Sequence, residues 1–230
     1  DMRSDDLVKI TVLNLAERRI LRPRLAESSD RPEHRMRHAT CVVKAPYLPD
    51  AVFSEAVLVL GGHATPVNGG AQPRGCVRSL LFLQMTKEDG SEVRWHTVPA
   101  SGTAPENIYN HECAAFAGGK RVCMFGGDIP QDDPEFFRIN DRQNASFVYV
   151  LDVTAQQWDI CRTTGPGPSW RSFHAAVAHT SWLDAYEYMV TFGGTDEHCD
   201  PLTGGRPADM RGYQLDLNRF HWRQGPGGGF

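Results

Sequence analysis

The stretch Val122-Cys123-Met124-Phe125-Gly126-Gly127, an apolar run closed by two glycines, decides the fold because it recurs. Counterparts lie on either side of it in the chain, at Val57–Gly62 and Met189–Gly194. The glycine pairs are 65 and 67 residues apart, and self-similarity at such a period indicates a repeat architecture. Apolar runs of this length that end at Gly predict short β-strands.

Two further features keep the same register as the glycine pairs. A Trp follows each pair, at spacings of 63 and 64 residues: Trp95, Trp158 and Trp222. A His precedes each pair and opens a run of small apolar residues: His38, His111 and His174. Leu13-Asn14 repeats the Leu-Asp pair found ahead of the later Trp residues, which indicates that the back half of an earlier unit lies at the N-terminus.

Each unit therefore contains four short strands. Strand a follows the His, strand b ends at Gly-Gly, strand c ends near Leu-Asp and strand d carries the Trp. Repeated four-stranded units are the signature of a β-propeller, in which stacked blades cover each other's faces. The sequence predicts an all-β, kelch-type propeller of about three and a half blades, a partial or open propeller within a longer chain.

The predicted organisation is one propeller segment over residues 1–230. Its parts are a half blade (7–25, strands c and d), three blades (35–95, 109–158 and 171–222) and a flexible tail (223–230). Glycine after strand b lets the chain leave the sheet at dihedrals closed to other residues, and Trp fills the wide gap between blades. The structural repeat motif is Gly61, Gly62, Trp95, Gly126, Gly127, Trp158, Gly193, Gly194 and Trp222.

In these features the sequence resembles the kelch repeat family. The matching residues are the strand-b runs with Gly-Gly, the later Tyr149 or Tyr213, the Trp after it, and the stretch from Gly165 to Val177. The units run about 64 residues against about 50 for kelch repeats, and the extra length follows the glycine pairs. The resemblance implies a non-catalytic interaction scaffold or adaptor whose b–c and d–a loops face the partner.

The long b–c loops are therefore the candidates for partner binding. Those from Asp128 to Ala145 and from Thr195 to Gly212 carry mixed, acid-leaning charge, and carboxylates accept charge-assisted hydrogen bonds from a basic peptide. The candidate residues are His63, Arg74, Asp128, Asp132, Asp133, Arg138, Arg142, Asp196, Glu197, His198, Arg206 and Arg211. The alternative interpretation is that these are solvated insertion loops without a partner.

Enzyme patterns are weaker. No GxSxG, HExxH or P-loop pattern occurs, and three equivalent His indicate a structural role, hydrogen-bonding backbone at the start of strand a. Residues 196–200 (Asp-Glu-His-Cys-Asp) group metal-ligand types, but zinc sites usually use separated pairs. We expect no catalytic residues, no metal and no cofactor. The alternative is the propeller domain of an enzyme, galactose-oxidase-like or metal-dependent, with loop-borne ligands.

Composition restricts the partners and the environment. The net charge is −4, which argues against nucleic acid as the partner, and no apolar run approaches the ~20 residues of a membrane-spanning helix. No signal peptide is visible and the six Cys are scattered, so we expect a cytoplasmic or nuclear protein with reduced thiols. We expect a protein or peptide partner, and self-association through apolar faces of the end blades.

Overall fold

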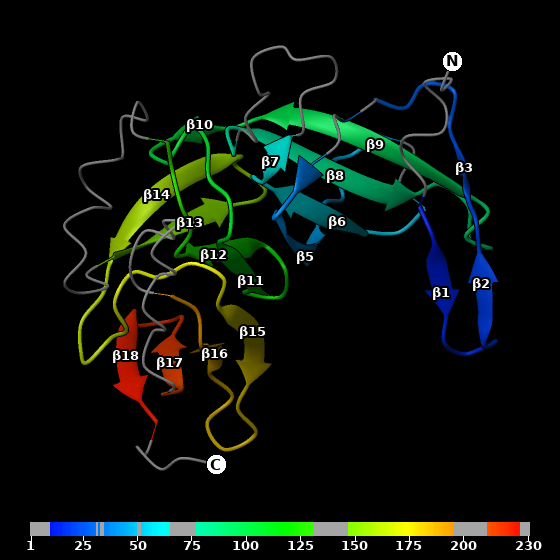
Figure 1. The fold of residues 1–230 in the computed structure, drawn as a ribbon. Helices are drawn as coiled ribbons and strands as arrows, with labels where there is room; N and C mark the ends of the chain where they lie inside the picture. Colours follow the sequence, from blue (N-terminus) through cyan, green and yellow to red (C-terminus); the bar gives the residue numbers. More distant parts are fainter. Residues whose placement is uncertain are drawn as a thin grey trace.

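The computed structural model describes residues 10–30, 32, 35–49, 52–64, 77–130, 147–195 and 211–225. Over these residues the chain forms β-strands and no helix. The strands make three large sheets that follow one another along an arc, and a separate two-stranded hairpin lies at the N-terminal end (Figure 1). The predicted all-β, open-propeller architecture is confirmed.

The first sheet, which we call blade 1, pairs four strands antiparallel in chain order. These are β5 (Ala39–Lys44), β6 (Glu55–Leu60), β8 (Ser79–Met85) and β9 (Glu92–Pro99). A short strand, β3 (Arg24–Leu25), adds to β9 in parallel orientation. The segment that precedes blade 1 in the chain therefore runs along its outermost strand.

Blades 2 and 3 repeat this arrangement. Blade 2 contains β11 (Glu112–Phe116), β12 (Arg121–Phe125), β13 (Phe147–Asp152) and β14 (Gln157–Arg162), with β10 (Ser101–Gly102) parallel to β14. Blade 3 contains β15 (Ala175–Thr180), β16 (Glu187–Phe192), β17 (Tyr213–Asp216) and β18 (His221–Gln224). Strand β18 takes in two residues of the segment that the sequence assigned to a flexible tail.

Four shorter strands complete the described chain. The N-terminal hairpin consists of β1 (Val12–Asn14) and β2 (Arg19–Leu21), which pair antiparallel. Strands β4 (Arg35–Met36) and β7 (His63–Ala64) form a two-residue ladder at the edge of blade 1 where β6 ends. The division of the chain at the predicted blade boundaries stays a prediction.

The core lies between the blades, and a Trp fills each joint. Trp158 is fully buried, and its Nε1 donates to the carbonyl oxygen of Val77 at 3.0 Å. Trp222 is also fully buried, and its ring meets Phe125 of blade 2 edge to face at 5.3 Å between centroids. Each Trp therefore packs toward the preceding part of the arc, where its large apolar area stabilises blade stacking.

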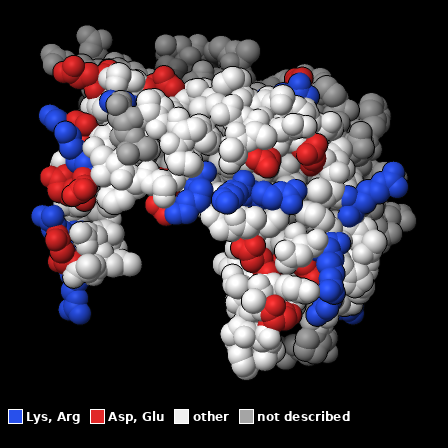
Figure 2. Space-filling model, turned by 180° about the vertical axis from the view of Figure 1, so that it is seen from behind, with Lys and Arg blue, Asp and Glu red and all other residues white. Residues whose placement is uncertain are grey.

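The arc is open between its two ends. Figure 2 shows the molecule from behind, with a notch between the N-terminal hairpin and blade 3. No helix in the described part of the chain is long and apolar enough to span a bilayer.

Candidate functional site

The b–c loops leave the three blades from one side of the arc, which we call the loop face. Each loop begins directly after Gly-Gly, at the root residue His63, Asp128 or Thr195. His63 pairs with Met36, and the other two roots form antiparallel bridges with Tyr109 and Ser172. Each root is thus hydrogen-bonded to the segment that leads into strand a of its own blade, so b–c and d–a segments emerge side by side.

Three residues in left-handed backbone line the inner edge of the loop face. They are Arg37 (φ 60), Asn110 (φ 58) and Phe173 (φ 57), each immediately before the His that opens strand a. We call them the inner ring. The N–H of Asn110 donates to Arg37 O, and the N–H of Phe173 donates to Asn110 O, both at 3.0 Å. Left-handed backbone costs about 1–2 kcal/mol for bulky residues, and such strain concentrates at functional sites.

The inner ring exposes an aromatic and a guanidinium side by side. Phe173 retains 48% of its accessible surface, and the Cζ of Arg37 lies 5.4 Å from the centroid of its ring. Aromatic and Arg side chains are the commonest anchors of protein interfaces. The ring therefore presents an anchor that reaches from the start of blade 1 to the start of blade 3.

Asp128 ties the loop face together from below. Its Oδ2 accepts from Asn110 Nδ2 and its Oδ1 accepts from Ser172 Oγ, both at 2.7 Å. The residue is 9% exposed. Because both carboxylate oxygens are used within the protein, Asp128 is placed to hold the inner ring in position beneath a partner.

His63 and Arg211 are the other predicted residues that the structure describes. The His63 ring meets Tyr109 edge to face at 5.6 Å. Burial, and then the charge of Asp128, raise the pKa of the Tyr109 phenol. Arg211 is exposed on the segment before β17, and its Nε donates at 3.1 Å to the Gln224 side-chain amide when that amide is oriented to accept.

The remaining predicted binding residues lie outside the described part of the chain. They are Arg74, Asp132, Asp133, Arg138, Arg142, Asp196, Glu197, His198 and Arg206. The segment 196–200, with its metal-ligand types, lies there as well. Over the described residues, no group of three or more His, Cys, Asp or Glu side chains is placed to hold a metal ion.

The repeated histidines pack against glycine at the joints between blades. A Cβ on Gly61 would lie 2.7 Å from Cε1 of His111, and one on Gly126 would lie 2.5 Å from Cε1 of His174. Both ring nitrogens of His111 are buried without a hydrogen-bond partner in the described structure. The expected hydrogen bond to backbone is wrong for His111, because the ring lies over the glycine of the preceding blade.

Burial keeps these imidazoles neutral. The pKa of His111 is lowered to about 3 by burial, with smaller effects from the charges of His174 and His38. The pKa of His174 is lowered to about 4 by burial and by the nearby Arg171 charge. Groups that are neutral and inaccessible at pH 7 are poorly suited to proton transfer with a ligand, so these His fit the structural role predicted for them.

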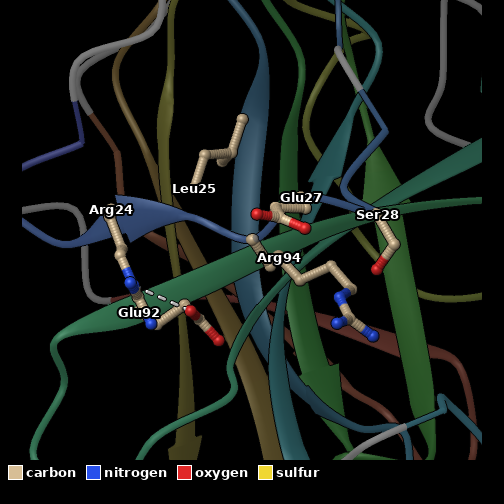
Figure 3. A pocket seen from close by; sticks show the side chains of 7 residues that line it. Arg24, Leu25, Glu27, Ser28, Glu92 and Arg94 are labelled. Atoms are coloured by element: carbon tan, nitrogen blue, oxygen red, sulfur yellow. Dashed lines mark ion pairs between the residues drawn. The ribbon is translucent and has the colours of Figure 1, made fainter.

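A shallow pocket of about 510 Å³ lies away from the loop face, between β3 and β9. Figure 3 shows Arg24, Glu27, Glu92 and Arg94 around it. Arg24 Nε pairs with a Glu92 carboxylate oxygen at 2.9 Å, and 74% of the Arg24 side chain is exposed. The pocket is lined by charges of both signs, and exposed pairs of this kind contribute little binding energy.

Charges of both signs also cover the face seen in Figure 2. Lys and Arg side chains form a band across its middle, and Asp and Glu side chains lie above and below that band. This mixed surface differs from the continuous basic stripe of nucleic-acid-binding domains.

Sequence reasoning missed the inner ring. Of its members only Asn110 is a residue type that favours left-handed backbone, while Arg37 and Phe173 give no such signal. The one available clue was position, since each residue directly precedes a repeated His.

The repeat region matches a known family. Residues 51–229 match the family described as the KLHDC2/KLHL20/DRC7 Kelch-repeats domain. The chain is similar to dynein regulatory complex subunit 7 of Chlamydomonas reinhardtii, with 30% identity over 126 residues, 50% of this chain and 10% of that protein. It is also similar to Kelch domain-containing protein 3 of Homo sapiens, with 24% identity over 159 residues, 69% of this chain and 36% of that protein. The chain spans between a tenth and about a third of these relatives.

A solved structure shares the fold. It is a cryo-EM structure of RAG in complex with one melted RSS and one unmelted RSS, in which one chain superposes with a TM-score of 0.55 at 18% identity. The match covers 90% of this chain and 54% of that chain. At this identity the likeness concerns the fold alone, and it agrees with the arc of stacked blades.

Proposed function

Because the chain belongs to this family of Kelch-repeats domains, we propose that it is a non-catalytic module that binds a protein partner at its loop face. The observation that carries the proposal is the inner ring, in which three equivalent positions hold strained backbone and present Phe173 beside Arg37. Strain at equivalent positions persists only where the surrounding structure maintains it. Here Asp128 and the backbone hydrogen bonds of the ring maintain it.

We further propose a partner segment that carries Lys or Arg. The b–c loops that rise around the inner ring hold Asp132, Asp133, Asp196 and Glu197. Carboxylates form charge-assisted hydrogen bonds with ammonium and guanidinium groups, and opposite charge also accelerates encounter. The similarity to a dynein regulatory complex subunit agrees with a role of this chain within a protein assembly as a scaffold or adaptor.

Two finer proposals concern the environment of the protein. Cys41, Cys113, Cys123 and Cys161 are free thiols, which supports residence in a reducing compartment such as the cytoplasm or nucleus. Apolar residues on the uncovered side of blade 3 support self-association of the chain. The net charge of −4 supports a protein partner over nucleic acid or an anionic membrane.

Affinity capture followed by charge reversal tests the proposed binding face. The tagged chain is used to isolate its partner, and the Kd is measured for the wild type and for the variant D132K/D133K/D196K. We expect binding at least about tenfold weaker, about 1.4 kcal/mol, with an unchanged melting temperature.

The charge-matched control is E88K/D89K/D159K. Glu88 and Asp89 lie in the turn between β8 and β9, and exposed Asp159 lies on β14, all away from the loop face. The control should bind as the wild type does. Equal affinity of the two triple variants would contradict the proposed face.

A further inference from the structure

Two joints between blades share one geometry. The imidazole of His111 covers Gly61 of blade 1, and the imidazole of His174 covers Gly126 of blade 2. At the same joints, the N–H of Gly62 donates to Ile108 O at 2.7 Å, and the N–H of Gly127 donates to Arg171 O at 2.9 Å. A glycine pair at the end of one blade is thus matched to the His segment of the next blade.

One glycine and one histidine remain unmatched. Gly193 ends strand b of blade 3 at φ +73, as Gly126 does at φ +72, yet a Cβ on Gly193 would meet nothing within 4 Å. His38 opens strand a of blade 1 and is exposed, whereas His111 is 2% and His174 is 4% exposed. The arc therefore carries the two halves of a third joint at its opposite ends.

The face of blade 3 beyond this glycine is an uncovered interblade face. The residue before the glycine pair is 1% exposed at Leu60 and 0% at Phe125, but 37% at Phe192. On strand a, Ala114 of blade 2 is 2% exposed, and its equivalent Val177 is 60% exposed. Val177 pairs with Val190, so these apolar residues form one continuous surface with Phe192.

Blade 1 has the complementary uncovered face at the other end. Val42 is 58% exposed, and its pairing partner Val57 is half-buried. The residues equivalent to Val57, which are Val122 and Met189, are fully buried against the preceding blade. Ile10 packs against the small cluster around Trp95, yet Val42 remains exposed.

We propose that blade 3 of one copy of this chain receives blade 1 of a second copy, with His38 of the second copy over Gly193 of the first. The proposal rests on the self-association proposed above and names the surfaces that pair. The second copy supplies the imidazole that the joint lacks, and apolar Val177 and Phe192 meet the face that carries Val42. Reciprocal pairing of two copies places six blades in one ring, within the ~4–8 blades of closed propellers.

Sedimentation equilibrium of the 230-residue chain tests the pairing. We expect a species of twice 25.6 kDa. The variant G193N places a Cβ where His38 of the second copy would lie, and Asn tolerates positive φ. It should be monomeric, with a dimer Kd raised at least about tenfold. The matched control is G118N, because Gly118 has φ +64 and equally open surroundings at a hairpin tip of blade 2. It should remain dimeric.

A mixing experiment identifies which faces meet. The variant V42D should also be monomeric, whereas L183D, at another exposed apolar position, should not. Because pairing is head to tail, a mixture of G193N and V42D retains one intact joint and should form a heterodimer. A dimer that V42D leaves intact, or a mixture that stays monomeric, would overturn the pairing while self-association stands. A monomeric wild type would overturn both and leave partner binding at the loop face untouched.

Discussion

Gly126 and His174 form a joint between blades 2 and 3 in which glycine is required by contact as well as by conformation. A Cβ on Gly126 would lie 2.5 Å from Cε1 of His174 and 2.2 Å from the carbonyl oxygen of Arg171. Real Cβ atoms do not approach other atoms this closely, so any side chain at this position must separate the blades. The joint therefore depends on the pairing of a glycine with a histidine 48 residues later.

The first prediction concerns this joint. G126A should lower the free energy of unfolding by about 3 kcal/mol or more, since left-handed backbone costs Ala about 1–2 kcal/mol and the clash adds about 1–3 kcal/mol. G118A is the matched control, because Gly118 also has positive φ but nothing lies within 4 Å. It should lose only the conformational part. Equal losses in urea denaturation would show that contact with His174 contributes nothing.

The second prediction concerns pH. The folded-state pKa values of His111 and His174, about 3 and about 4, lie below the unfolded value of 6.5, so only the unfolded chain binds protons at these sites above pH 5. Their contribution to stability is complete above pH 6.5 and falls as the pH drops below it. Between pH 6 and 5 the slope approaches about 1.4 kcal/mol per pH unit for each His.

Denaturation at several pH values measures that slope. H174Q should be less stable at pH 7.5, since packing is lost, and should remove about half of the slope between pH 6.5 and 5. H179Q, at an exposed position on β15, is the control and should retain the full slope. An unchanged slope in H174Q would mean that His174 is protonated in the folded protein.

The third prediction concerns the tie between Asp128 and Ser172. D128N removes one acceptor from the pair of 2.7 Å hydrogen bonds and should cost about 1–3 kcal/mol. S172A removes one partner only and should cost about 1 kcal/mol. A double-mutant cycle should give a coupling energy of at least about 0.5 kcal/mol. Strict additivity would mean that this hydrogen bond does not connect the blades.

The sequence predicts the fold more completely than the site. The spacing of Gly61, Gly126 and Gly193 gave the four-stranded repeat, because glycine pairs and their apolar strands are local signals. The uncovered side of blade 3 followed from the same count. The parallel links β3–β9 and β10–β14 were not foreseen, since strands of two residues leave no hydrophobic pattern.

The candidate site depends on contacts that sequence spacing does not encode. Asp128 was proposed as a ligand for a partner, yet its oxygens face Asn110 and Ser172, the latter 44 residues away. Phe173 was not selected at all, because an aromatic residue before a buried His resembles part of a core strand. Only the assembled blades show that its ring is half exposed beside Arg37.

The fourth prediction concerns strain and binding at the inner ring. F173N should raise stability by about 0.5 kcal/mol, because relief of left-handed strain exceeds the lost contact with Arg37. The same variant should weaken partner binding at least about fivefold, since the aromatic anchor is gone.

A117N is the matched control for this variant. Ala117 also has positive φ, 53°, and it lies in the turn between β11 and β12, away from the loop face. It should gain stability and leave binding unchanged. If F173N binds the partner as tightly as the wild type, Phe173 is not an anchor.

Amide hydrogen exchange of the chain, alone and saturated with its captured partner, tests the binding face most directly. The account predicts slower exchange at the loop face, in peptides that contain residues 35–38, 61–64, 107–111 and 171–174. The turns at 86–91, 117–120 and 153–156 should exchange equally in both samples. Protection confined to those turns, with no change around the inner ring, would contradict the proposed binding face.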